Sequence, residues 1–418
     1  MGCPICKKFQ QFRSIFTGKD KGFMGKGFKE YSSGSTFIGK GFKLGDYKKE
    51  KLLDIDQENT SRNIHTFVVG ASGVGKSKLM EGPMEADVKA GRNVVVIDPK
   101  GGGDIYSRLV QAAYAAGREN DLMYCSPIFP EYSIEINPMG NYYMEEELIN
   151  HAMAAVSSDD EFFYAASLEL STIIIKGLLL HHRYDSPEGH LLNFREVAEY
   201  TSYDKLTKLQ KNLKTYAEQH GDRDAEYLAN LAATQLKTGA EHFGKLTASL
   251  RVALTEMTSG NTGKIIGNAT TNIFIDKIER GEGVILYVQT GSMIVSRAAS
   301  TLARVITSMI QSVVGRHDAS GLKLARPLCY YGDEFSNVVY RGCEDLFNKG
   351  RGAGVWITAA TQSVADMIAE IGPERTRKLM DNTSTKIVMR QNDYQSAMHF
   401  AAFGGLKKKY SAMLSLSG

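Results

Sequence analysis

Residues 64–77 constrain the fold more than any other stretch of the chain. The segment from Thr66 to Val69 is short, apolar and partly β-branched, which is typical of a buried strand. The next eight residues spell G-x-x-x-x-G-K-S, and residues 78–89 then have the composition of a helix. A strand, a glycine-rich loop and a helix in this order are the context that a phosphate-binding P-loop requires.

Each part of this loop has a chemical reason to be there. Glycines let the backbone turn sharply, so that N–H groups point into one concavity and bind phosphate oxygens, and the following helix adds its dipole. We expect Lys76 to reach the β- and γ-phosphates of ATP, and the Ser77 hydroxyl to bind Mg²⁺. The predicted nucleotide-binding loop consists of Gly70, Ala71, Ser72, Gly73, Val74, Gly75, Lys76 and Ser77. A glycine-rich turn that binds nothing is the alternative, but the full pattern in this context is far more specific than a lone GxGxxG.

Length and composition set the frame. The 418 residues suggest two or three domains, and 43% hydrophobic with 23% charged residues is ordinary for a soluble globular protein. Five cysteines without a secretory signal indicate a reducing, cytoplasmic compartment. No transmembrane span is predicted, because the most apolar long stretch, Ile173–Leu180, contains Lys176 and is flanked by Glu169 and His181.

Residues 1–60 are predicted to form a separate N-terminal arm. Its first 51 residues hold twelve Lys or Arg against four acidic residues, with seven Phe between them. Basic residues that alternate with aromatic ones suit an anionic surface, either nucleic acid or acidic lipid. The alternative is an arm that is partly disordered, or a short hairpin packed on the core. Cys3 and Cys6 have C-x-x-C spacing, but neither a second pair for zinc nor a thioredoxin-like context follows.

A second strand, at residues 93–97, leads into Asp98, Lys100 and a glycine-rich loop. A charged pair at the carboxyl end of a strand, near a phosphate site, is well placed for function. We therefore predict that Asp98 and Lys100 contribute to nucleotide binding. The alternative is a polar loop with a helix cap at Asp104.

Residues 141–263 change character, because strand signals vanish and helical periodicity takes over. Apolar side chains recur on one helix face at Leu206, Leu209, Leu213 and Tyr216. This segment is predicted to be an all-α domain inserted into an α/β domain made of residues 61–140 and 264–418. The adjacent His181 and His182 do not share a helix face, so we expect a surface or packing role for them.

The α/β pattern resumes at residues 283–290, and a later apolar run ends in Asp333 and Glu334, the pattern of a Walker B strand. Asp333 would hold Mg²⁺ through its water shell. Glu334 would be the general base that orients and deprotonates the attacking water. Strands often end in acids, but this one follows a P-loop with βα units between the two.

Two further side chains are predicted to take part in hydrolysis. Gln362 stands at the tip of the strand that follows the Walker B strand, where it can sense the γ-phosphate and couple hydrolysis to movement. Arg351 could reach a phosphate across a subunit boundary as an arginine finger. The alternative for Arg351 is a cation that complements the dipole at a helix C-terminus.

Together these motifs resemble one family, the type IV coupling proteins, which are the TraD-like ATPases of bacterial conjugation and type IV secretion. The resemblance covers about residues 60–405 and includes a helical insertion between Walker A and Walker B. It is carried by Gly-Ala-Ser-Gly-Val-Gly-Lys-Ser (70–77), Ile-Asp-Pro-Lys-Gly (97–101), Ile-Asn-Pro-Met (136–139), Gly-Asp-Glu-Phe (332–335) and Gly-Arg-Gly-Ala-Gly…Ala-Thr-Gln-Ser (350–363).

The resemblance implies a RecA-like P-loop NTPase with a mainly parallel central sheet and an inserted all-α domain. It further implies ATP and Mg²⁺ as cofactors and a ring, typically of six subunits, at the cytoplasmic face of the bacterial inner membrane. Such rings recruit a relaxase–DNA complex and drive DNA or protein effectors toward the secretion channel. The family pattern supports Arg351 as a finger acting in trans and Gln362 as a sensor, and gives the all-α domain contacts with DNA or the relaxosome.

Family members usually begin with a transmembrane hairpin, which this chain is predicted to lack. One hypothesis is that the basic arm docks on anionic lipid or on a separate membrane subunit. Two alternatives to a DNA-pumping coupling protein stay open. An FtsK-like DNA translocase is disfavoured by the large helical insertion and by the lack of a winged-helix tail. A largely non-hydrolytic recruitment platform is disfavoured by the intact Lys76, Asp333, Glu334 and Gln362.

Overall fold

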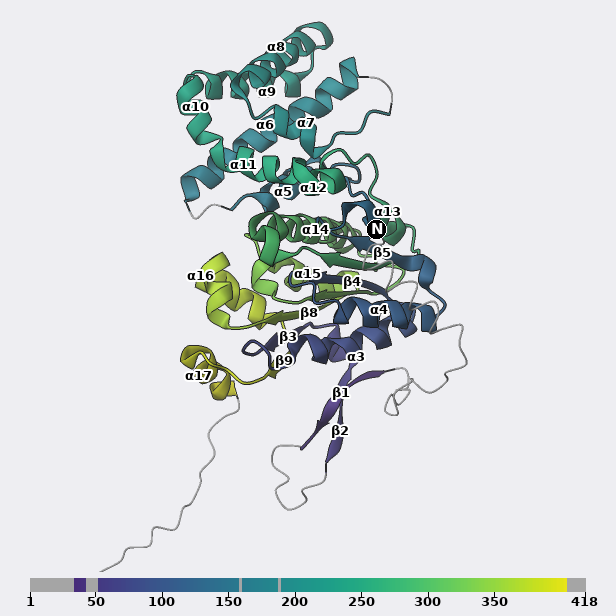
Figure 1. Ribbon diagram of the computed structural model, residues 1–418. Helices are drawn as coiled ribbons and strands as arrows, with labels where there is room; N and C mark the ends of the chain where they lie inside the picture. Colours follow the sequence, from purple (N-terminus) through teal and green to yellow (C-terminus); the bar gives the residue numbers. More distant parts are fainter. Residues whose placement is uncertain (1–33, 43–51, 158–159, 187–188, 404–418) are drawn as a thin grey trace, which may run out of the picture.

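The computed structural model describes residues 34–42, 52–157, 160–186 and 189–403 (Figure 1). Most of the predicted basic arm, including Cys3 and Cys6, lies outside these residues, and so does the end of the chain after residue 403. The described part is built around one central sheet, with helices on both of its faces and a further group of helices beyond (Figure 1).

The central sheet has seven strands, ordered β5-β6-β4-β7-β8-β3-β9, and every neighbouring pair is parallel. The strands are β3 (Thr66–Val69), β4 (Asn93–Asp98), β5 (Leu122–Cys125), β6 (Ile285–Gln289), β7 (Leu328–Gly332), β8 (Val355–Thr361) and β9 (Thr385–Val388). A parallel sheet confirms the predicted α/β fold, and it places the ends of β3, β4, β7 and β8 at the same edge.

Side chains along each strand alternate between two apolar layers. Val94 and Val96 of β4 pack in the layer that contains the helices α3 (Lys76–Lys89) and α4 (Asp104–Ala115). Val95 and Ile97 point the other way, into a larger core. That second face is covered by α14 (Ser292–Ser320), α15 (Glu344–Ala353) and α16 (Val364–Asp381). Burial on both faces explains why these strands are continuous apolar runs.

The segment between β5 and β6 is helical and extends away from the sheet beyond α14 (Figure 1). Its helices are α5 (Glu145–Ala155), α6 (Glu161–Asp185), α7 (Phe194–Glu199), α8 (Tyr203–His220), α9 (Arg223–Leu236), α10 (Ala240–Leu246), α11 (Ala248–Thr258), α12 (Gly260–Thr262) and α13 (Ile273–Glu279). One apolar cluster runs from the sheet through α14 and α5 into α6, α8 and α11. The core itself therefore marks no boundary, and the predicted limits of a separate all-α domain stay a prediction.

The remaining elements are short. The helices are α2 (Asn59–Arg62) and α17 (Tyr394–Phe403), and the short helical turns are η1 (Glu119–Asp121), η2 (Pro130–Tyr132), η3 (Gly263–Gly267) and η4 (Phe335–Asn337).

By length and composition alone, one described helix, α6, is long and apolar enough to cross a membrane. Half of its apolar window is buried inside the molecule. It packs against α5, α8 and α9, and its Lys176 pairs with Glu146 at 2.6 Å. Because α6 contacts helices on several sides, it packs as the central helix of the helical layer.

The described part of the N-terminal arm is an antiparallel hairpin of β1 (Ser35–Gly41) and β2 (Leu53–Glu58), which projects beside α3 (Figure 1). For these residues the hairpin alternative of the sequence argument is confirmed. The end of β2 is tied to the sheet by Gln57, whose Nε2 donates to the hydroxyls of Thr66 and Thr385, at 2.8 Å each.

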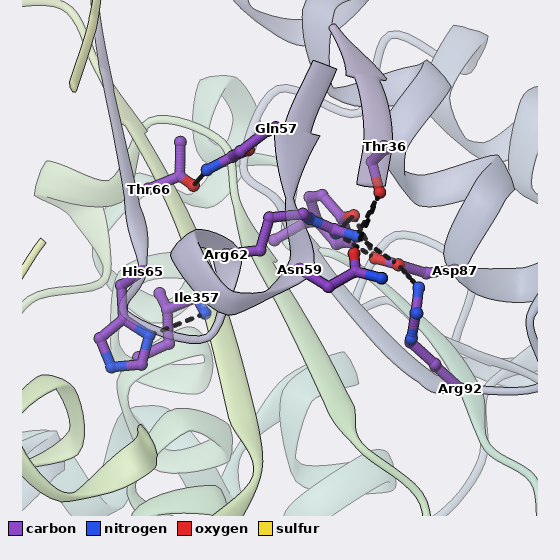
Figure 2. Close-up of polar contacts among 10 residues, drawn as sticks. Thr36, Gln57, Asn59, Arg62, His65, Thr66, Asp87, Arg92 and Ile357 are labelled. Atoms are coloured by element: carbon purple, nitrogen blue, oxygen red, sulfur yellow. Dashed lines mark hydrogen bonds and ion pairs between the residues drawn. The ribbon is translucent and has the colours of Figure 1, made fainter. Parts of the chain in front are cut away.

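A buried ion-pair network fastens this hairpin to the body of the protein (Figure 2). The Arg62 guanidinium, only 4% exposed, donates to Thr36 at 2.9 Å, to both carboxylate oxygens of Asp87 at 2.8 and 2.6 Å, and to the Tyr331 hydroxyl. Arg92 donates to the same carboxylate at 2.8 Å. Burial raises the pKa of Asp87, but the two arginines outweigh it and hold the pKa below its usual value.

Candidate nucleotide site

The predicted phosphate-binding loop connects β3 to α3 and lies between the ends of two neighbouring strands. Gly70 N donates to Thr361 O at 3.2 Å, and Ala71 N donates to Arg390 O at 2.8 Å. Gly75, which precedes the first residue of α3, has φ 99°, in the left-handed region that favours glycine. The loop is thus held at the carboxyl edge of the sheet, with the amino end of α3 behind it.

Lys76 is the first residue of α3, and its side chain turns back across the loop. Its Nζ donates to Gly70 O at 2.7 Å and to Ala71 O at 3.2 Å. Burial lowers the pKa of Lys76, and the nearby Glu334 carboxylate opposes that shift. A phosphate would offer this buried ammonium a stronger, charge-assisted bond than the two carbonyls do.

Ser77 and Asp333 meet as the metal prediction requires. Ser77 Oγ donates to Asp333 Oδ2 at 2.6 Å, and Asp333 N donates to Ile97 O at 3.0 Å, which fixes the acid beside the end of β4. Burial raises the pKa of Asp333, and the neighbouring Asp98 and Glu334 carboxylates raise it further. A hydroxyl and a carboxylate among other carboxylates form an oxygen-rich, negative pocket, which is the donor set that Mg²⁺ prefers.

The Glu334 carboxylate is held from two sides. Gln362 Nε2 donates to its Oε2 at 3.0 Å, and Lys100 Nζ donates to its Oε1. Glu334 is 3% exposed and has φ 47°, an uncommon left-handed backbone for a residue with a side chain. Such strain persists only where the surroundings fix it, and it often marks functional positions.

Asp98 organises the loop after β4. Its Oδ1 accepts from Lys100 N at 3.0 Å and from Gly101 N at 2.8 Å, while its Oδ2 accepts from the Tyr287 hydroxyl at 2.6 Å. This arrangement presents Lys100 to Glu334. Burial lowers the pKa of Lys100, but the contact with Glu334 outweighs it, so that the pKa is raised and the ammonium is kept. Direct contact of Asp98 or Lys100 with a nucleotide stays a prediction.

Two side chains of β6 support this loop and were not singled out from the sequence. Besides the Tyr287 contact, Gln289 Nε2 donates to Gly101 O at 3.1 Å, and Gln289 Oε1 accepts from the Tyr124 hydroxyl at 2.6 Å. Burial raises the pKa of Tyr287, so that the hydroxyl stays protonated and donates. The sequence carries one signal for their role. Tyr287 and Gln289 are polar side chains at alternate positions near the end of an otherwise apolar strand, so both point to the same side of the sheet.

Arg351 does not join this site within the chain. It is an exposed residue in the last turn of α15, and its carbonyl accepts from Gly354 N at 3.3 Å. Because α15 leads into the start of β8, Arg351 lies at the amino end of the sheet, opposite the P-loop of the same chain. The structure therefore brings together Lys76, Glu334 and Gln362, and a contribution of Arg351 across a subunit boundary stays a prediction.

Comparison with family models finds one match. Residues 327–415 match the family described as the TraM recognition site of TraD and TraG. The matched segment includes β7, with Asp333 and Glu334 directly after it, and also Arg351 and Gln362. No curated protein matches the chain.

Several solved structures share the fold. The bacterial conjugative coupling protein TrwB (TrwBdeltaN70), in a trigonal form with sulphate, is 18% identical over 86% of this chain and 78% of that chain, with a TM-score of 0.59. Plasmid coupling protein TrwB in complex with ADP and Mg²⁺ is 18% identical over 86% and 79%, also at 0.59. VirB4 of Thermoanaerobacter pseudethanolicus is 13% identical over 91% and 90%, at 0.53. These likenesses confirm the predicted RecA-like fold class with its helical segment.

Proposed function

We propose that this TraD/TraG-like chain, with the fold of TrwB, is an ATP-hydrolysing coupling protein that recruits a relaxase–DNA complex and moves DNA into a type IV secretion or conjugation channel. The observation that carries the proposal is the arrangement at the carboxyl edge of the sheet. There Ser77 contacts Asp333 at 2.6 Å, and Glu334 beside them is held by Gln362 at 3.0 Å. A protein that only bound nucleotide would have no need of a fixed carboxylate next to the metal ligands.

Each residue then has a role in hydrolysis. Lys76 exchanges its two backbone carbonyls for the β- and γ-phosphates of ATP. Ser77 and Asp333 would hold Mg²⁺, which would neutralise negative charge on the phosphates. Glu334 would orient a water and accept its proton as the water oxygen bonds to the γ-phosphorus, while the bond from that phosphorus to the β–γ bridging oxygen breaks and ADP leaves. Lys100, whose side chain is 45% exposed, would turn from Glu334 toward the incoming phosphate.

Gln362 connects the chemistry to movement. Its amide contacts Glu334 from the end of β8, and Ser363 next to it caps α16 through Asp366 N at 3.1 Å. Loss of the γ-phosphate would change the position of Gln362 and so the start of α16. This is the step through which hydrolysis would displace a bound strand of DNA.

A ring of six subunits would complete the site. Arg351 is exposed at the end of the sheet opposite its own P-loop, so only a neighbouring chain could bring it to a phosphate. The TraM recognition match supports a relaxosome partner at residues 327–415. We further propose that the ring works at the cytoplasmic face of the bacterial inner membrane, with the basic arm on anionic lipid. Flotation with anionic vesicles tests that contact, and a chain that does not float with them contradicts it.

Steady-state ATP hydrolysis with and without DNA tests the proposal, in the parent and in Lys76→Ala. Strong stimulation by DNA that is lost in the variant supports a nucleic-acid motor. Tight nucleotide binding without turnover under any DNA condition contradicts it and favours the recruitment platform. A reconstituted transfer assay separates the remaining alternative. If ATP turnover is stimulated by DNA and DNA is moved equally well without a relaxase, the FtsK-like translocase is favoured.

A further inference from the structure

Three side chains capable of binding a metal converge in the helical layer, away from the nucleotide site. His182 stands in the last turn of α6, Glu196 in the first turn of α7, and His190 in the segment between them. Their ligand atoms all lie within 4.8 Å of one another, which is close enough for the three side chains to share one metal ion. We propose that His182, His190 and Glu196 form a binding site for a divalent transition-metal ion of the Zn²⁺ class.

The spacing of the three side chains is close to the spacing of ligands around one metal ion. His182 Nε2 lies 2.6 Å from Glu196 Oε1, and His190 Nε2 lies 3.2 Å from Glu196 Oε2. The two imidazole rings are edge to face, with centroids 4.4 Å apart. In a tetrahedral zinc site with bonds of ~2.0–2.1 Å, ligand atoms are roughly 3.3 Å apart. The His190–Glu196 separation is close to that value, whereas His182 and Glu196 would have to move apart for the three side chains to hold one ion.

The donor set favours the same class of ion. Two imidazoles and one carboxylate are borderline ligands that suit Zn²⁺, whereas Mg²⁺ and Ca²⁺ prefer oxygen alone. Three protein ligands leave a fourth position for water. The side chain of His190 is 44% exposed, against 10% for His182 and 21% for Glu196, so an ion can enter from solvent and meet two pre-positioned ligands.

The surrounding structure orients the two partly buried ligands, His182 and Glu196. Asn193 caps α7 by accepting from Glu196 N at 3.0 Å, which sets the start of the helix and the direction of the glutamate. His181 turns away from the cluster, to the Tyr216 hydroxyl at 2.7 Å. The two adjacent histidines thus contact different helices, as expected for neighbours that do not share a helix face. A metal-binding role for His182 departs from the surface or packing role that the sequence predicts, because its metal partners come from elsewhere in the chain.

The same contacts would also exist if Glu196 only accepted hydrogen bonds from two histidines, so the test must separate the two cases. The test uses the full chain without nucleotide, titrated with Zn²⁺ and with Co²⁺ near neutral pH. Cys3→Ser and Cys6→Ser are introduced first, because two thiolates at C-x-x-C spacing would compete for Zn²⁺ even without a second pair. We expect one Zn²⁺ per chain and, with Co²⁺, the visible absorption band of a tetrahedral nitrogen and oxygen site.

His190→Ala is the informative variant, because its side chain is the most exposed of the three and its loss should leave the fold intact. We expect it to weaken Zn²⁺ binding by more than the 10–100-fold typical of a lost outer partner, and to remove the Co²⁺ band. His242→Ala, an exposed histidine of α10, is the matched control and should bind like the parent. Equal binding in the parent and in His190→Ala, or no binding in either, would overturn the proposal and leave a hydrogen-bonded cluster only.

Discussion

The two ends of the central sheet both bury charged side chains, but they use them differently. At the amino end, the two oxygens of the fully buried Asp87 accept from Arg62 and Arg92 (Figure 2). The Tyr331 hydroxyl donates to the same carboxylate. At the carboxyl end, the Lys76 ammonium donates to backbone carbonyls, and Lys100 reaches Glu334 from a half-exposed position. The first arrangement is a closed ion-pair network, in which the charges are paired with one another inside the protein. In the second, Lys76 contacts only neutral carbonyls and Lys100 is half exposed, an arrangement that the proposed nucleotide site requires.

The largest expected effect comes from Arg351, which lies at the amino end but is predicted to act at the carboxyl end of a neighbour. Arg351→Ala should lower ATP turnover of the assembled ring by ~10³-fold or more, because a finger stabilises charge in the transition state. Nucleotide binding and thermal stability should not change, since the side chain is exposed. Lys349→Ala, an exposed cation on the same helix, is the control. Normal turnover of Arg351→Ala in a ring of confirmed size would rule out the finger.

Disrupting the Asp87 ion-pair network should lower the free energy of unfolding without directly affecting ATP hydrolysis. Asp87→Ala leaves the Arg62 guanidinium buried and unpaired, so we expect a loss of about 3–5 kcal/mol in the free energy of unfolding. Glu218→Ala removes an exposed pair with Lys214 and should cost less than about 0.5 kcal/mol. Denaturant unfolding of both variants measures the contrast, and equal stability would show that the network contributes nothing.

Acid should weaken the described core through two buried histidines. His65 Nδ1 accepts from Ile357 N at 3.2 Å (Figure 2). Its Nε2 lies 2.9 Å from Phe347 O, so the ring must stay neutral, and burial lowers its pKa to about 4. Burial similarly lowers the pKa of His151, to about 3. Because the unfolded chain binds these protons near pH 6.5, this stability is complete above that pH and is lost as the pH falls toward the folded values.

At pH 5 we expect a loss of about 2 kcal/mol for each histidine relative to pH 7.5, at constant ionic strength. Unfolding free energies of the parent between these two pH values give the slope, and His151→Gln should reduce it. A parent whose stability is flat over this range would contradict the assignment of a neutral, buried His65.

The smallest effect is expected at Gln362. Gln362→Ala removes one of the two contacts that hold Glu334, and we expect ATP turnover to fall roughly tenfold with unchanged nucleotide affinity. Gln395→Ala, an exposed glutamine of α17, should behave like the parent. If Gln362→Ala weakened nucleotide binding instead, the glutamine would be a ligand of the nucleotide rather than a support for the base.

The sequence predicted the fold and the centre of the candidate site because both depend on local patterns. The G-x-x-x-x-G-K-S loop and the apolar run before Asp333 each predict a role from their own residues, and parallel strands then bring Ser77 and Asp333 to one edge. The meeting of Lys100 with Glu334 was not predictable in the same way. It depends on strand order, which puts β4 beside β7 although the residues are far apart in the chain.

Residues whose role arises from packing were missed for the same reason. Tyr287 and Gln289 support the loop after β4 only because β6 is its neighbour. Arg62 reads as one more basic residue near a basic arm, yet it is buried and paired with Asp87. His190 and Glu196 join His182 through the turn between α6 and α7, which helical periodicity does not specify.

The most direct test of the central claim is ATP hydrolysis by Glu334→Gln, measured together with nucleotide binding and in the presence of DNA. The substitution keeps the size of the side chain but removes the base, so we predict a loss of ~10²–10⁴-fold in turnover with nucleotide affinity close to that of the parent. Turnover like that of the parent would show that Glu334 is not the base. The buried charges at the carboxyl end of the sheet would then be a second ion-pair network that serves stability.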